Sequence, residues 1–208
     1  MATSDTQIIN LALIRVGAAT IGSLTDQSRE AEIAKKIYDP LRRELLESHL
    51  WNFALARKAL GKLANGPDFG FEFYYAISSD VLRIIEFNGG ESGTVGAGRP
   101  TVGIDLIPLW KVEYDPSTDT RVIATNDSKA EILYVHDIKD VTQYKPTFLE
   151  AFASRLAVEF SYVFTNSVNL TDSLQTRFEK KLALARSFDA QEGSPQQVDA
   201  NLWLNQRF

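Results

Sequence analysis

The sequence predicts an α+β protein that is mainly α: a four-helix-type bundle with an inserted small antiparallel β-sheet and an extended C-terminal tail. Four segments place apolar residues at three- and four-residue steps, the helical period. Between about residues 70 and 138 the pattern changes to short alternating runs separated by turn residues. We therefore divide the chain into N-terminal helices (1–65), a β-rich insertion with a glycine-rich loop (66–140), a C-terminal helical hairpin (141–193) and a tail (194–208).

The first helix is predicted from its end signals. Ser4 and Gln7 have the spacing of a capping box, in which each side chain accepts a hydrogen bond from the other residue's backbone. Gly17 can adopt the left-handed conformation that ends a helix. The apolar stripe between these signals consists of Ile9, Ala12, Leu13 and Val16.

The stretch from Arg29 to Leu60 contains the main helix, capped by Asp26 or Ser28. Pro40 lies inside it and removes a backbone donor, so we expect a kink or two shorter helices. Trp51 and Phe53 follow and supply more apolar area per residue than any earlier part of the chain, which makes them the expected core anchors. The stripe of the helix itself is Ala31, Ala34, Ile37, Tyr38, Leu41, Leu45 and Leu46.

The β-rich insertion begins with an aromatic run and contains a long glycine-rich loop at 88–103. The loop has no Walker lysine followed by Ser or Thr and no helical period after it, so it does not resemble a phosphate cradle. We expect it to pack on a neighbouring molecule. Strands are expected at 81–87, 104–114, 121–125 and 130–137, and the aromatic run consists of Phe69, Phe71, Phe73, Tyr74 and Tyr75.

Two helical stripes return after Pro146, which suits the first turn of a helix. They are separated by a break at 166–169, so the two helices should pack antiparallel. The tail is polar except for a few large side chains, which mark either a partner surface or a segment that folds back on its own helices. The stripes are Phe148, Phe152, Leu156, Phe160 and Phe164, then Leu174, Phe178, Leu182, Ala185 and Phe188.

Composition excludes several classes of function. The formal net charge of -5 argues against a nucleic-acid grip, which needs clustered Lys and Arg. The chain has no cysteine and 2 histidines without metal-ligand spacing, so we expect no metal, cofactor or nucleophilic thiol. No apolar run is long enough for a membrane span, and Asp5 lies where a signal peptide would be basic, so a cytoplasmic chain without membrane contact is expected.

Carboxylate pairs are the remaining catalytic option, because glycoside hydrolysis needs only two Asp or Glu side chains. The candidate pairs are Asp137 with Asp140 and Glu44 with Glu47. Sugars stack on exposed rings, so such a site would be sought beside the aromatic run. With 27 acidic residues in the chain, some pair is always close, so this pairing adds little weight.

One pattern that runs through the chain resembles a known family. It includes Tyr38, Asp39, Leu41, Arg42 and Leu45, the sequence Trp51-Asn52-Phe53-Ala54, and Arg57 and Leu60. The likeness extends to the segments 9–13, 80–84 and 146–157, to Gly17, and to Trp203 and Arg207. These residues resemble the tail tubular protein A family of short-tailed phages, which are head-to-tail adaptors.

The resemblance implies a structural virion protein, located in the phage tail and assembled in the host cytoplasm. Its relatives form a dodecameric ring between the portal protein and the tail nozzle protein, and DNA passes through during ejection without specific binding. The chain alone could still be a monomer. The alternatives are a polysaccharide-degrading tail component that uses a carboxylate pair, and a generic helical binding protein of the cytosol.

The adaptor reading assigns two sets of contact residues. The tail would dock on the portal, and the glycine-rich loop would contact the next subunit or the nozzle. The portal-docking candidates are Leu202, Trp203, Leu204, Arg207 and Phe208; the loop candidates are Asn88, Gly89, Gly90, Gly96, Gly98 and Arg99.

Overall fold

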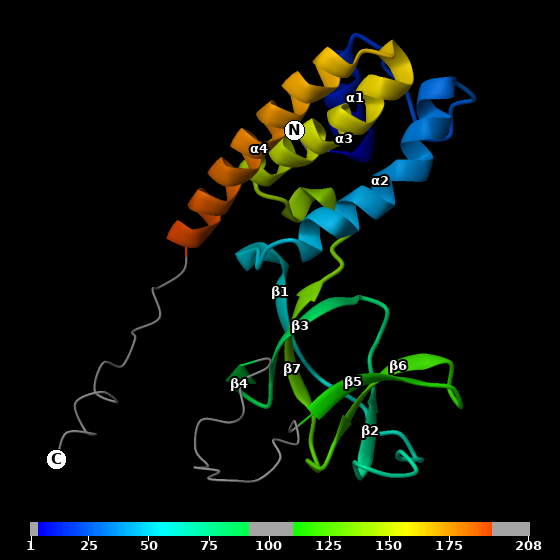
Figure 1. Ribbon diagram of the computed structural model, residues 1–208, viewed down its shortest axis with the longest axis vertical. Helices are drawn as coiled ribbons and strands as arrows, with labels where there is room; N and C mark the ends of the chain where they lie inside the picture. Colours follow the sequence, from blue (N-terminus) through cyan, green and yellow to red (C-terminus); the bar gives the residue numbers. More distant parts are fainter. Residues whose placement is uncertain (1–3, 92–109, 193–208) are drawn as a thin grey trace, which may run out of the picture.

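Helix α3 (Pro146–Thr165) is the helix on which the other three pack. The structure is a computed structural model that describes residues 4–91 and 110–192. In it α1 (Asp5–Val16), α2 (Arg29–Glu47) and α4 (Val168–Gln191) all contact α3, and α4 runs antiparallel to it after a two-residue connection. Figure 1 shows these helices gathered at one end of the molecule and the strands at the other.

The helix ends follow their local chemistry. The Ser4 hydroxyl accepts from the Gln7 amide at 3.3 Å, the Gln7 side chain accepts from the Ser4 amide at 3.2 Å, and Gly17 ends α1 with φ of 72°. Ser28 caps α2. However, α2 continues through Pro40 without interruption, so the expectation of two shorter helices is wrong. Packing of its apolar face outweighs the one backbone hydrogen bond that proline removes.

The strands form two antiparallel sheets. One has the order β1-β7-β3-β4 and the other β2-β6-β5. The residues after β1 carry the chain from the first sheet to the second, because Leu60 donates to Ala130 and Leu63 donates to Tyr74, each at 2.8 Å. The strands are β1 (Leu55–Ala59), β2 (Phe73–Ala76), β3 (Val81–Phe87), β4 (Gly90–Glu91), β5 (Trp110–Asp115), β6 (Thr120–Thr125) and β7 (Glu131–His136).

The predicted fold, a four-helix-type bundle with a small inserted sheet, is therefore wrong. The molecule is an α+β fold with two sheets, and the sheets enclose a hydrophobic core separate from that of the helices. Every side chain needed for this second core comes from strands or their flanks, so the sheets do not depend on a helical bundle to bury them. The core consists of Tyr75, Ile77, Val81, Phe87, Ile123, Ala130, Ile132 and Tyr134.

A buried arginine ties the helical layer to the sheets. Arg42 of α2, only 2% exposed, donates to Asp137 Oδ1 and to the carbonyl oxygen of Ile138, each at 2.6 Å. Burial alone lowers the pKa of Arg42, but its hydrogen bonds, including the one to Asp137, more than offset this and raise the pKa overall. The guanidinium therefore stays charged and holds the end of β7 against α2.

Candidate functional site

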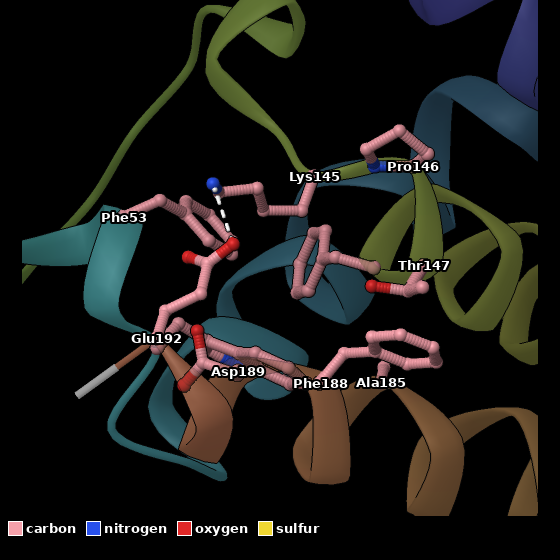
Figure 2. Close-up of a pocket in the computed structure, with 10 residues that line it drawn as sticks. Phe53, Lys145, Pro146, Thr147, Ala185, Phe188, Asp189 and Glu192 are labelled. Carbon is pink, nitrogen blue, oxygen red and sulfur yellow. Dashed lines mark hydrogen bonds and ion pairs between the residues drawn. The ribbon is translucent and has the colours of Figure 1, made fainter. Parts of the chain in front are cut away.

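A groove opens where the start of α3, the end of α4 and the connection between α2 and β1 meet. Its volume is about 210 Å³. Figure 2 shows Lys145, Pro146 and Thr147 from the start of α3 on one side, and Ala185, Phe188 and Asp189 from α4 on the other. The complete lining is Trp51, Phe53, Lys145, Pro146, Thr147, Phe148, Ala185, Phe188, Asp189 and Glu192.

The groove exists because α4 is longer than its partner helix. α3 has 20 residues and α4 has 24, and at the other end of the hairpin two residues separate the end of α3 from the start of α4. At 1.5 Å per residue, α4 extends about 6 Å past the start of α3. Phe188 lies on this last turn and is 51% exposed, so the expectation that it continues the buried stripe of Ala185 is wrong.

Aromatic side chains form the inner wall of the groove. Trp51 is 1% exposed, and its indole Nε1 donates to the carbonyl oxygen of Leu45 at 3.0 Å. The Phe148 ring meets Trp51 edge to face, with ring centroids 5.0 Å apart. Phe53 is partly buried, with its centroid 5.1 Å from that of Phe148. Such edge-to-face pairs stabilise their geometry beyond simple burial, so this wall is well defined.

Asp189 fixes the end of α4 to the α2–β1 connection. Its side chain accepts from the Asn52 backbone amide at 3.0 Å, and its carbonyl oxygen accepts from the Asn52 side chain at 2.6 Å. The same carboxylate lies 3.2 Å from Nε2 of His49. Lys145 and Glu192 form an ion pair at 3.0 Å, which Figure 2 shows at the mouth of the groove. The rim is therefore polar and the wall apolar.

The predicted contact residues fall into two groups. Asn88 and Gly89 form the turn into β4, both with positive φ, and Gly90 is the first residue of that strand. The Asn88 side chain is fully engaged in this turn: it donates to Asp127 and to the carbonyl of Lys129, and accepts from the Glu131 amide. Outside the described residues lie Gly96, Gly98 and Arg99, and the tail candidates Leu202, Trp203, Leu204, Arg207 and Phe208.

The proposed carboxylate pairs hold structural interactions. Asp137 is bound by Arg42 and also lies 3.6 Å from Nε of Arg43. Asp140 caps a short 3-10 helix, and hydrogen bonds from Thr142 lower the pKa of its carboxyl, whereas a general acid needs a raised pKa.

The second pair and the aromatic run give no combined site. Glu44 lies 3.6 Å from Arg155, and Glu44 and Glu47 line a depression of about 810 Å³ between α2 and β3. Phe69 is 88% exposed, but Tyr75 is buried and its hydroxyl donates to the carbonyl of Asp127. The rings of the run therefore do not form one exposed sugar platform, and they do not line the depression that holds the two glutamates.

Sequence reasoning missed the groove, since its polar rim residues carry no motif. The apolar stripes gave no warning either, since the last one (174–188) is no longer than the one it packs on (148–164). Among the described residues, no three His, Asp or Glu side chains gather as a metal site, and none of the described helices is long and apolar enough to cross a membrane. No protein-family model matches the sequence, and a comparison with curated proteins finds no match.

Proposed function

We propose that the chain is a structural virion protein, an adaptor that forms a ring between the portal and the tail nozzle of a short-tailed phage. The proposal starts from the resemblance to the tail tubular protein A family. The single observation that supports it is that three polar residues of that pattern, Tyr38, Arg42 and Asn52, each join α2 or the connection after it to a different element.

These three residues contact three different parts of the chain. The Tyr38 hydroxyl of α2 donates to Asp5 of α1 at 2.6 Å. Arg42 joins α2 to the end of β7 through Asp137. Asn52 joins the α2–β1 connection to α4 through Asp189. Tyr38 and Arg42 are buried, and because buried polar groups are costly unless they are hydrogen-bonded, their contacts favour one arrangement of the helices and sheets.

The surface supports an assembly role in two ways. Tyr162, Val163 and Val168 are exposed around the α3–α4 turn, and large exposed apolar side chains of this kind suit lateral contacts between ring subunits. The formal net charge of -5 suits a channel that DNA crosses without binding, since repulsion acts over about 8–10 Å at physiological salt. We do not extend the proposal to polysaccharide hydrolysis, because Asp137 and Asp140 already serve as an ion-pair partner and a cap.

The test is light scattering and electron microscopy of the full chain with and without the portal protein of the same virion. The adaptor proposal expects the chain to join the portal as a ring. A version ending after Gly193 should bind at least tenfold more weakly, because it lacks the docking candidates Leu202, Trp203, Leu204, Arg207 and Phe208. If the full chain remains a free monomer beside the portal, the proposal is refuted, and polysaccharide turnover becomes the next assay.

A further inference from the structure

The aromatic groove lies at the point where the described part of the chain ends. Glu192, which lines the groove, is directly followed by residues 193–208. That segment contains three consecutive large apolar residues, Leu202, Trp203 and Leu204. The groove, at about 210 Å³, exceeds the apolar cavity of about 150 Å³ that accommodates a benzene ring. It therefore has room for one aromatic side chain.

The chemistry of the groove suits an indole. Its walls carry aromatic rings, and Phe188 projects a half-exposed ring at its edge. Its rim offers oxygens from Thr147 and Glu192, both drawn beside the opening in Figure 2. Tryptophan combines a large apolar body with one N–H donor, so it can fill the space and still satisfy its polar atom at the rim.

We propose that Trp203 of the chain's own segment 194–208 occupies this groove before the protein assembles. Residues 193–202 connect Glu192 to Trp203 and can span more than about 30 Å when extended, which is ample for a return to the groove. A short linker holds its end at an effective concentration on the order of 1 mM. A second chain at about 1 µM is roughly a thousandfold less concentrated, so the chain's own tryptophan outcompetes a neighbour's.

This docked state goes beyond the adaptor role and does not depend on it. If the same segment binds a portal, it must first leave the groove, and the two contacts compete. If there is no portal partner, the segment is still expected in the groove. The experiment below uses the purified chain alone, so its outcome is separate from that of the portal assay.

The absence of cysteine from the sequence allows disulfide trapping in the full chain. Thr147→Cys at the groove rim is paired with Leu204→Cys beside Trp203. The matched control pairs Leu204→Cys with Val168→Cys, which is exposed at the other end of α4, about 30 Å away along the helix. A disulfide requires Cα atoms within about 7 Å. We expect the groove pair to oxidise at least tenfold faster than the control pair and to give a monomeric product.

Two further variants test which side chains are responsible. Trp203→Ala or Phe188→Ser, added to the groove pair, should reduce its rate to that of the control pair. Leu184→Ser should leave the rate unchanged, because Leu184 is 47% exposed on the same helix but does not line the groove. Circular dichroism of each variant checks that the helices are intact.

Three results would overturn the proposal. Equal oxidation rates for the groove and control pairs would mean that the segment does not prefer the groove. Bonds formed only between two chains would make a second copy the occupant. If the groove pair oxidises fast and Trp203→Ala does not change its rate, a side chain other than Trp203 is responsible for the docking.

Discussion

The buried ion pair between α2 and the sheets gives the sharpest stability prediction. Arg42→Met keeps an unbranched side chain in the core but removes the charge that faces Asp137, whose side chain is only 7% exposed. Breaking one partner of a buried pair costs about 3–5 kcal/mol, because the remaining charge is buried without compensation. Arg43 lies 3.6 Å from the same carboxylate and is half exposed, so it compensates in part. We therefore expect Arg42→Met to lower the free energy of unfolding by about 3 kcal/mol, the lower end of that range.

A second variant separates the ion pair from the packing. Arg42→Met combined with Asp137→Leu removes both charges, so no unpaired carboxylate remains. The carbonyl of Ile138 keeps a partner, since the Tyr144 hydroxyl also donates to it at 2.6 Å. The double variant should therefore be more stable than Arg42→Met alone. Its stability should come close to that of the starting protein, because replacing a whole buried ion pair by apolar residues is often neutral or stabilising.

Urea denaturation followed by circular dichroism measures these differences, and Arg42→Met should also lower Tm by about 6–12 °C for a chain of this size. The stability of Arg42→Lys should lie between that of the starting protein and that of Arg42→Met. An ammonium group keeps the charge but cannot bind the carboxylate and the carbonyl with the geometry of a guanidinium. The reasoning is refuted if Arg42→Met costs less than about 1 kcal/mol, or if adding Asp137→Leu makes the protein still less stable.

Three further predictions concern packing, capping and pH. Trp51→Ala should lower the free energy of unfolding by about 3–5 kcal/mol in urea titrations, since the indole is 1% exposed; a loss below about 1 kcal/mol would contradict its role. Ser4→Ala should cost about 1 kcal/mol through loss of the α1 cap, and amide hydrogen exchange should increase in the first turn only. Burial raises the pKa of Tyr144 from 10.0 to about 12, so the stability it contributes is present below pH 10 and is lost as pH rises towards 12. Tyr144→Phe should flatten the fall in the urea midpoint over that interval, and an unchanged slope would count against this assignment.

Local chemistry explains the parts of the fold that could be predicted. The Ser4 capping box, the left-handed Gly17 and Pro146 in the first turn of α3 act within a few residues of themselves, so the sequence alone is sufficient. β3 also matches its predicted bounds, Val81–Phe87, because turn residues flank a run that is apolar except for Arg83 and Glu86.

The errors arose where distant partners decide the structure. β1, with the sequence LARKA, lacks an alternating pattern, so its sequence predicts no strand and places it with the N-terminal helices. It forms a strand because it pairs with β7, in which Val135 lies opposite Leu55. The intrinsic β-propensity of these residues affects the structure less than their pairing with a neighbouring strand does. The groove was missed for the same reason. Periodicity places Phe188 on an apolar stripe, but only the packed hairpin shows that α3 begins too late to cover it.

The pairing of Leu55 with Val135 also has a consequence for how the chain folds during synthesis. The helical core is discontinuous, since α2 ends at Glu47 and α3 starts at Pro146. Closing an unstructured loop of that length costs roughly 4 kcal/mol of chain entropy. The described strands, however, leave the ribosome before α3, and the pairing of β1 with β7 brings residues 55 and 135 together. Once the sheets have folded, α3 emerges next to α2 and α1, and a slow long-range search becomes a local docking step.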